Sequence, residues 1–421
     1  MVRSLEFLNL LVFFLFLIFY AYQFVFIGVR LFKKNHIKTA KKLHRYAVVI
    51  AARNESSVIG ELIKSIKTQN YPKELLDVYV VADNCTDDTA AVANENGAFV
   101  IVRNNLQEVG KSYALNYAFK KIDESCGIRS YEGYLVFDAD NIIDKNYIRE
   151  INNVFDSGYP VVTSYRNSKN YGYNWISAGY ALWFLRESKY LNGSRMLCNS
   201  SCAISGTGYL VSSEIIAEDG GWKYNLMTED IEFTVDKVIH GKTIGYCETA
   251  VLYDEQPIDW KTSWNQRMRW TKGFYQVMHD YGTKLLRGCC AKKGFQCFDM
   301  LATIAPAILI SIAMFALNFF AVGMGLIQGH DMIVSMALYN VWAALRNIYL
   351  SLFFFGMVTT ITEWNKIRCD AVKKIVYLFT FPVFMFTYFP IAIATIFKYR
   401  EVKWVPINHT FVGNVSELYN D

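Results

Sequence analysis

The stretch YLVFDAD, residues 134–140, is a short apolar run that ends in two carboxylates one residue apart. Such a run is typical of a strand buried within a sheet. Asp138 and Asp140 therefore stand at the end of a predicted strand, where their oxygens suit a hard divalent cation that also binds substrate phosphates. Because an isolated Asp-x-Asp pair is more often a solvated turn, its meaning depends on what surrounds it.

Two strands with a similar pattern precede this stretch. Residues 46–51 (YAVVIA) lead into a polar turn, and a helix follows until Pro72 stops it. Residues 78–81 (VYVV) carry Asp83 at their C-terminal end, where a second helix begins. This alternation predicts a doubly wound α/β sheet, whose ligands bind outside the carboxyl ends of the strands. Asp83 therefore lies where a nucleotide would bind.

Two further motifs have residues that suit an anionic ligand. Gly110-Lys111 opens a predicted helix whose first N–H groups, with the Lys111 ammonium, can meet a pyrophosphate. A glycine is also common in the turn before a helix that binds no ligand, however. Gln266, Arg269 and Trp270 lie on one face of a later predicted helix. That face either binds substrate or forms the polar side of a helix on a membrane surface.

In their order and spacing, these motifs resemble a membrane-embedded, inverting glycosyltransferase of family 2, the group that contains cellulose, hyaluronan and poly-N-acetylglucosamine synthases. The resemblance covers about residues 45–272. It implies a GT-A type nucleotide-diphospho-sugar transferase domain with a mixed, mainly parallel sheet, joined to amphipathic interface helices and transmembrane helices. The chain departs from the family pattern where Ala82-Asp83 replaces a paired Asp-Asp and where no proline precedes Arg53.

The resemblance also implies a role for each motif. The family's Glu-Asp pair supplies the catalytic base, which would be Asp230 with Glu229 beside it. Asp138 and Asp140 would hold Mg²⁺ or Mn²⁺ together with the donor diphosphate. The positions expected to bind the donor or the acceptor are Glu55, Asp83, Lys111, Asp138, Gly206, Gln266, Arg269 and Trp270.

The expected chemistry explains why these residue types are needed. Displacing a nucleoside diphosphate from an anomeric carbon requires a base for the acceptor hydroxyl and positive charge on the leaving group. A carboxylate meets the first need, and a metal with Arg269 and Lys111 meets the second. A single in-line displacement inverts the anomeric centre, so an α-linked UDP-sugar gives a β-linked product. UDP-glucose and UDP-N-acetylglucosamine are equal candidates for the donor.

The composition indicates one soluble domain with several membrane spans, since 53% of the 421 residues are hydrophobic and 16% are aromatic. Residues 7–29 are almost continuously apolar and form a run long enough to cross a bilayer. A basic run extends from Arg30 to Arg45, and such an excess marks the cytoplasmic side. We therefore expect a multi-pass protein of the cell membrane with a cytosolic catalytic domain. The basic run should contact anionic membrane lipids rather than nucleic acid.

We expect five segments along the chain. They are an N-terminal transmembrane helix at 1–30, a cytosolic glycosyltransferase domain at 31–255, interface helices with the Gln-x-x-Arg-Trp motif at 256–298, a transmembrane region at 299–398 with a short cytosolic connection near 362–374, and a C-terminal tail at 399–421. Three simple spans after the catalytic domain would place the basic tail outside, against the charge rule. A re-entrant hairpin at Pro382 and Pro390 would return it to the cytosol, which is the arrangement we favour. Arg346 either faces a bundle interior or a wet cavity, or marks a break in its apolar stretch.

Three functions remain open. The first, which we favour because of the Gln-x-x-Arg-Trp motif, is a processive synthase that lengthens a β-linked polysaccharide and passes it outward. A homo-oligomer or a small accessory subunit could complete its channel. The second transfers one or a few sugars to a membrane lipid, and the small number of spans favours it. The third is an inactive transferase-like transporter or scaffold, which the intact Asp138, Asp140 and Asp230 argue against.

Overall fold

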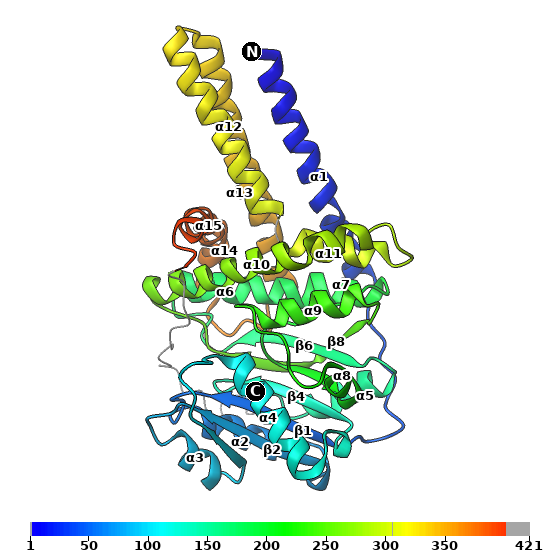
Figure 1. Ribbon diagram of the computed structural model, residues 1–421. Coiled ribbons are helices and arrows are strands. Elements are labelled where there is room, and N and C mark those ends of the chain that lie inside the picture. Colours follow the sequence, from blue (N-terminus) through cyan, green and yellow to red (C-terminus); the bar gives the residue numbers. More distant parts are fainter. Residues whose placement is uncertain (1, 305, 401–421) are drawn as a thin grey trace.

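The computed structural model describes residues 2–304 and 306–400, and a single eight-stranded sheet forms its lower half in Figure 1. The strand order is β3-β2-β1-β4-β7-β6-β8-β5. The first four strands are parallel, and β7 runs antiparallel to both of its neighbours. The predicted mixed, mainly parallel sheet is therefore confirmed. The strands are β1 (Tyr46–Ala52), β2 (Leu76–Asp83), β3 (Phe99–Arg103), β4 (Gly133–Asp138), β5 (Ile142–Ile143), β6 (Val161–Ser168), β7 (Tyr209–Ser212) and β8 (Ile244–Asp254).

The strand order creates a topological switch point between β1 and β4. β2 and β3 extend the sheet on one side of β1, whereas β4 lies on the other side. Ala51 pairs with Asp138 and Ala52 pairs with Ala82, so the three strands end at the same edge. Ligands of such sheets bind in the crevice at this edge. The sheet thus places the expected nucleotide and metal positions next to each other.

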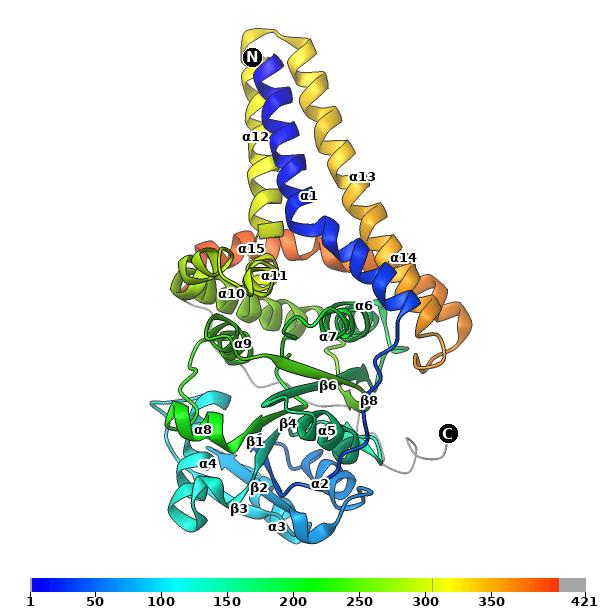
Figure 2. The same cartoon turned by 90° about the vertical axis from the view of Figure 1, so that its right-hand side faces the viewer.

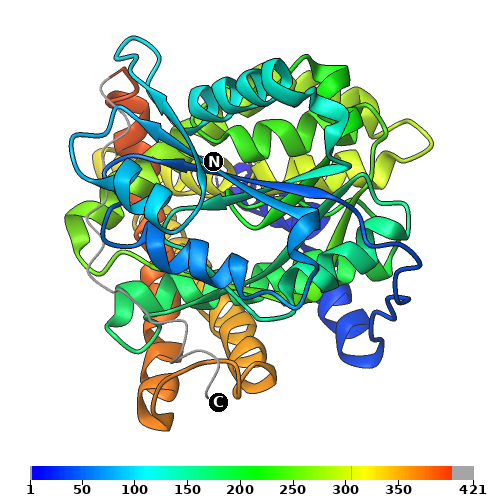
Figure 3. The ribbon, with the colours of Figure 1, turned by 90° about the horizontal axis from the view of Figure 1, so that it is seen from below.

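Helices cover both faces of the sheet (Figure 3). In this part of the chain they are α2 (Ile59–Lys67), α3 (Thr89–Glu95), α4 (Lys111–Cys126), α5 (Tyr147–Asp156), α6 (Trp175–Arg186), α7 (Gly193–Leu197), α8 (Ser213–Asp219) and α9 (Glu229–Ile239). Ala47 and Val49 of β1 pack in a core with α4 and α6, whereas Val48 and Ile50 pack with α2 and α5. β1 is apolar throughout because both of its faces are buried.

A layer of helices separates the sheet from the rest of the molecule. α6 and α9 belong to it, together with α10 (Trp260–Gly288) and α11 (Gly294–Ile304), and all four run across the top of the sheet domain (Figures 1 and 2). α10 begins after Asp259, whose carboxylate accepts a hydrogen bond of 2.9 Å from the Thr262 N–H. Such a cap satisfies one of the free donors at a helix start. The Gln-x-x-Arg-Trp motif therefore lies on a single continuous helix.

Three long apolar helices extend away from this layer (Figures 1 and 2). They are α1 (Val2–Phe32), α12 (Pro306–Gln328) and α13 (Asp331–Thr362). Their far ends pack through a buried apolar cluster formed by Leu5, Ala321, Ile333 and Ala337. Closer to the sheet, Asn9 and Asn318 exchange hydrogen bonds of 2.8 and 3.2 Å. The three helices thus meet firmly at the end that is furthest from the sheet.

A fourth apolar segment, α14 (Ala371–Phe386) with α15 (Tyr388–Phe397), is also long and apolar enough to cross a membrane. It nevertheless lies across the base of the other three helices (Figure 2). The Phe384 ring packs so closely over Gly179 of α6 that a methyl group added there would overlap it. Arg267 of α10 donates hydrogen bonds to the Phe384 carbonyl and the Thr387 hydroxyl, at the turn between α14 and α15. This placement differs from the expected span because α6 and α10 pack against this segment.

Two further expectations concern the C-terminal half. α13 is one continuous helix through Arg346 and Asn347, so the alternative that its apolar stretch breaks there is wrong. The Arg346 side chain is exposed, while Asn347 lines the large cavity of the molecule. The tail expected at 399–421 lies outside the described residues beyond Arg400.

Candidate active site

One cavity of about 1900 Å³ begins at the carboxyl ends of β1, β2 and β4 and continues past α10 to the space between α1, α12 and α13. Residues from distant parts of the sequence meet along it. All of the predicted site residues line this cavity: Glu55, Asp83, Lys111, Asp138, Asp140, Gly206, Glu229, Asp230, Gln266, Arg269 and Trp270. Their individual roles stay predictions, but the fold brings every one of them to a single site.

Hydrogen bonds and tight turns fix the strand-end edge of the cavity. Asp83 is buried and accepts hydrogen bonds of 2.6 Å from Arg103 Nη1 and 3.0 Å from Asn84 Nδ2. Asn54 and Asn84 adopt φ angles of 58° and 53°, a left-handed conformation that asparagine tolerates better than most residues. These two residues turn the chain sharply after β1 and β2, and Glu55 follows the first turn. The two carboxylates are thereby fixed at adjacent strand ends.

Lys111, the first residue of α4, connects two sides of the site. Its ammonium pairs with the Asp138 carboxylate and donates a hydrogen bond of 2.6 Å to the Gly206 carbonyl. Burial disfavours the charged ammonium, but the carboxylates of Asp138, Glu229 and Asp230 outweigh that effect and raise the pKa of Lys111. The side chain therefore carries a positive charge at neutral pH. A donor diphosphate would meet this charge at the helix start.

Asp138 and Asp140 offer oxygen ligands at the cavity wall. Asp140 accepts hydrogen bonds of 3.0 Å from the Glu255 N–H and 3.2 Å from the Asn141 amide. Asp138 keeps 39% of its side chain exposed. Within residues 2–304 and 306–400, no three His, Cys, Asp or Glu side chains are grouped to hold a metal alone. The pair therefore fits Mg²⁺ or Mn²⁺ completed by donor phosphates and water, rather than a metal held only by protein.

The candidate base lies at the start of α9. Burial raises the pKa of Asp230, and burial with the nearby Asp230 charge raises the pKa of Glu229 to about 7. Lys111 lowers both pKa values, and Arg269 also lowers that of Glu229. A carboxylate whose pKa is raised accepts a proton more readily, which suits a general base that works near neutral pH.

Gly206 brings the backbone close to this base. Its φ angle is 77°, in the left-handed region that favours glycine. The position of a Cβ atom there would lie 3.7 Å from Asp230 Oδ2. A larger residue would narrow the space in front of the Asp230 carboxylate.

The opposite wall of the cavity comes from α10. Gln266 Oε1 and Arg269 Nε are buried and have no hydrogen-bond partner among the described residues. Burial lowers the pKa of Arg269, although its guanidinium stays charged at neutral pH. Buried polar atoms normally have partners, so both atoms are available to a ligand. Trp270 lies beside them and packs edge-on against Tyr180 and Phe184, at ring distances of 5.6 and 6.1 Å.

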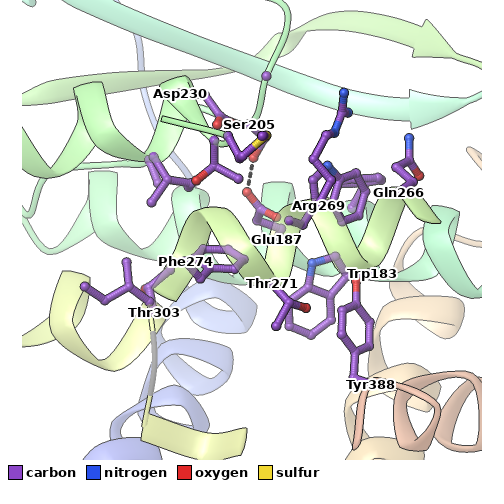
Figure 4. A pocket seen from close by; sticks show the side chains of 18 of the residues that line it. Trp183, Glu187, Ser205, Asp230, Gln266, Arg269, Thr271, Phe274, Thr303 and Tyr388 are labelled. Atoms are coloured by element: carbon purple, nitrogen blue, oxygen red, sulfur yellow. Dashed lines mark hydrogen bonds between the residues drawn. The ribbon is translucent and has the colours of Figure 1, made fainter. Parts of the chain in front are cut away.

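The structure adds polar residues that the motifs did not indicate. Glu187 accepts a hydrogen bond from the Ser205 hydroxyl, and Figure 4 shows this pair beside Asp230. Arg166 of β6 pairs with Asp254 and donates a hydrogen bond of 2.9 Å to the Ser205 carbonyl. Glu187 begins a π-helical turn, Glu187–Asn192, and such turns are frequent at functional sites. The charge of Arg166 within a strand could have indicated a site residue from the sequence. No sequence pattern predicts the π-helical turn that begins at Glu187.

Carboxylates and cations around the crevice of a mixed α/β sheet, next to long apolar helices, define a nucleotide-sugar transferase of the GT-A type. A family model described as glycosyltransferase like family 2 matches residues 44–273, which is more than half of the chain. The chain therefore belongs to this family, and it is a glycosyltransferase.

Several curated relatives are similar to this chain. The probable glycosyltransferase YdaM of Bacillus subtilis is 27% identical over 260 residues, covering 56% of this chain and 57% of that protein. The β-monoglucosyldiacylglycerol synthase of Synechocystis is 26% identical over 242 residues, covering 56% and 48%. The poly-β-1,6-N-acetyl-D-glucosamine synthase of Staphylococcus aureus is 26% identical over 243 residues, covering 56% of each chain. The chain spans about half the length of the curated relatives it matches.

Solved structures are similar at a lower level. A mannosyltransferase of Pyrobaculum calidifontis, in complex with GDP-Man and Mn²⁺, has a TM-score of 0.49 at 17% identity, covering 81% of this chain and 98% of that one. TarS residues 1–349 of Staphylococcus aureus, in complex with UDP-GlcNAc, has a TM-score of 0.42 at 14% identity, covering 71% and 92%.

Proposed function

We propose that this enzyme transfers a sugar from a UDP-sugar, with inversion, to a lipid acceptor held at the cytosolic face of the membrane. The observation that carries this proposal is the single cavity that joins the strand ends to the space between the apolar helices. A soluble donor enters at the strand ends. An acceptor anchored in the bilayer reaches the same base from the other end.

The proposed reaction is one displacement. Asp230 takes the proton as the acceptor O–H bond breaks, and the acceptor oxygen forms a bond to the anomeric carbon. The bond from that carbon to the diphosphate breaks, and its electron pair leaves with UDP. Lys111 and Arg269 stabilise the charge that develops on the leaving group. Asp138 and Asp140 would hold a divalent cation, which adds Lewis-acid stabilisation of the diphosphate when it is bound.

The shape and lining of the cavity support a lipid acceptor. We call its part between α1, α12 and α13 the vault, defined by Phe13, Phe16, Leu17, Met314, Ile348 and Leu352. These side chains are apolar, as acyl chains require. Beyond the lining residues Asn9 and Asn340, the apolar cluster around Ala337 packs the three helices together. The relatives named β-monoglucosyldiacylglycerol synthase agree with such an acceptor.

A processive polysaccharide synthase is the second candidate. Gln266, Arg269 and Trp270 favour it, and so does the relative named as a poly-β-1,6-N-acetyl-D-glucosamine synthase. A glycan channel would need an open path between the far ends of α1, α12 and α13, however, where the described residues pack closely. A homo-oligomer or a small accessory subunit would then have to build the channel elsewhere.

The position of α14 and α15 across the base of the other three apolar helices supports a proposal for membrane topology. α1, α12 and α13 would be three spans, with α10, α11, α14 and α15 at the cytosolic interface. The basic connection with Lys366, Arg368, Lys373 and Lys374 then lies on the catalytic side. Basic residues favour the cytoplasmic side, so the catalytic domain is cytosolic. This arrangement removes the conflict between the number of spans and the charge rule without a re-entrant hairpin.

The product distinguishes the two candidates. Purified enzyme in lipid nanodiscs would receive each UDP-sugar in turn with Mg²⁺ or Mn²⁺, and both UDP release and product size would be measured. We expect one discrete glycolipid, and we expect excess chelator to abolish its formation. A ladder or a high polymer would select the processive synthase instead.

A further inference from the structure

Arg186, the last residue of α6, lies where the vault meets the catalytic domain. It lines the cavity and is only 6% exposed. Its guanidinium donates a hydrogen bond to Gln23 Oε1 of α1 and lies 4.9 Å from the Trp183 ring and 4.8 Å from the Phe355 ring of α13. These neighbours belong to the membrane helices and to α6 itself. The guanidinium of Arg186 therefore contacts the apolar helices rather than the residues at the strand ends.

Arg186 forms no ion pair in the described part of the chain. Three other buried arginines each face a carboxylate, in the pairs Arg30–Glu248, Arg103–Asp83 and Arg195–Asp299. A fourth, Arg267, donates its hydrogen bonds to carbonyl and hydroxyl oxygens instead, but unlike Arg186 it does not line the cavity. Among the described residues, no carboxylate pairs with Arg186, and its Nη1 has no hydrogen-bond partner. Burial lowers the pKa of Arg186 to about 10, and the nearby Tyr22 and Glu187 oppose this shift only in part, so the group is still charged at neutral pH. An unpaired buried charge is strongly destabilising, and proteins keep such groups mainly for function.

We propose that Arg186, with Gln23, binds the phosphate of an anionic acceptor lipid whose acyl or prenyl chains occupy the vault. This inference rests on the proposed function, and it specifies the acceptor as a phosphate-bearing lipid. A guanidinium presents donors in a planar fork that matches phosphate oxygens. The Gln23 amide can donate to the same group.

The position of Arg186 favours a lipid phosphate over the donor diphosphate. Lys111 and Arg269 already supply positive charge where the donor leaves, on the sheet side of α10. The rings of Trp183 and Phe355 flank Arg186. Tryptophan is common at the boundary between headgroups and acyl chains, because its ring is apolar and its N–H is polar. A lipid phosphate lies at this boundary. The headgroup hydroxyl of a lipid such as phosphatidylglycerol would then extend past Glu187 toward Asp230, whereas a polyprenyl phosphate would offer a phosphate oxygen itself as the acceptor.

Lipid binding can be measured apart from sugar transfer. Full-length enzyme would be reconstituted in phosphatidylcholine nanodiscs that contain phosphatidylglycerol, a polyprenyl phosphate or diacylglycerol. Native mass spectrometry after mild detergent extraction would then count the retained lipid. We expect wild type to retain one of the two phosphate lipids over diacylglycerol, and Arg186→Gln to lose that retention at least tenfold. UDP affinity should stay within twofold, which also shows that the variant is folded.

Two further variants strengthen the test. Arg346→Gln removes an exposed cation from α13 that does not line the cavity, so retention should not change. Phe355→Glu places a carboxylate beside Arg186 without removing it, and it should exclude phosphate lipids equally well.

Three outcomes would overturn the inference. The first is equal retention of phosphate lipids in wild type, Arg186→Gln and Phe355→Glu. The second is a loss of UDP affinity in Arg186→Gln as large as the loss of lipid, because Arg186 would then bind the donor. The third is displacement of the lipid by low millimolar inorganic phosphate alone, which would indicate a site for soluble anions. Lipid retention without any transfer would contradict the proposed function while leaving the binding site intact.

Discussion

At the residue scale, the site combines three carboxylates with two cations in a buried space. The carboxylates are Glu187, Glu229 and Asp230, and the cations are Lys111 and Arg269. Asp230 raises the pKa of Glu229, Glu187 raises that of Asp230, and burial makes the negative charges at Glu229 and Asp230 costly. Lys111 and Arg269 offset part of this cost, and in the proposed function both would stabilise the donor diphosphate. This balance makes the charge state of the site sensitive to single substitutions.

The first prediction concerns the base. Asp230→Asn should reduce turnover by about 100-fold or more, because an amide cannot accept the acceptor proton. UDP affinity should stay within about twofold, since Asp230 acts on the acceptor and not on the nucleotide. Turnover and UDP binding would be measured on the same preparation, with Asp280→Asn as an exposed carboxylate control. Near wild-type turnover would contradict the assignment of Asp230.

The second prediction concerns pH. The base works only when deprotonated, so turnover rises as pH increases through the pKa of the coupled Glu229 and Asp230. The Glu187 charge raises the pKa of Asp230. Glu187→Gln removes this charge but keeps an oxygen that can accept from Ser205, so the acid limb of kcat should move to lower pH, on the order of half a unit.

The control for the pH prediction is Glu218→Gln, an exposed carboxylate paired with Lys242. It should leave the kcat profile between about pH 5 and 9 unchanged. An unmoved midpoint in Glu187→Gln, or a midpoint at higher pH, would show that Glu187 does not act on the base.

At the element scale, the sequence predicted much of the fold and part of the site. The strands near 46–51, 78–81 and 134–138 are confirmed, because strands buried on both faces must be apolar throughout. The arrangement of α14 and α15 could not be predicted, since apolar residues look the same whether lipid or protein covers them. The contact of Arg267 with the turn at Thr387 helps to fix that arrangement. Arg186 and Glu187 were missed because only tertiary structure shows their neighbours.

The third prediction concerns the approach of α10 to α9. A Cβ atom at Gly273 would lie 2.8 Å from the Thr228 backbone nitrogen, just before the Glu229-Asp230 pair. Gly273→Ala should therefore push Arg269 away from the base and lower kcat by roughly 10- to 100-fold, as small misplacements of catalytic groups do. Gly282→Ala is the matched control on the same helix, because the atoms nearest to its Cβ would belong to the flexible Met278 side chain. Equal activity of both variants would contradict the proposed close approach.

At the scale of the whole molecule, the distribution of charge supports the proposed arrangement of three spans above a layer of interface helices. In the described segments at the far end, residues 2–6 and 328–332, Arg3 is the one Lys or Arg. The opposite end carries the basic residues that follow α1, those between α10 and α11, and those between α13 and α14. A fourth span through α14 and α15 would separate Lys398 and Arg400 from these groups. The three-span arrangement keeps them on one side, as the charge rule requires.

The fourth prediction tests this arrangement in intact cells. An epitope inserted after Gly329 should bind antibody from outside, because α12 and α13 would cross the membrane in opposite directions on either side of it. An epitope inserted after Arg368 and a tag at the C-terminus should bind antibody only after the membrane is permeabilised. An accessible C-terminal tag would show that α14 and α15 cross the bilayer, and the layer seen across the base would then not persist in the membrane. An inaccessible Gly329 epitope would mean that α12 and α13 do not span, and the vault could not hold a lipid acceptor from the bilayer.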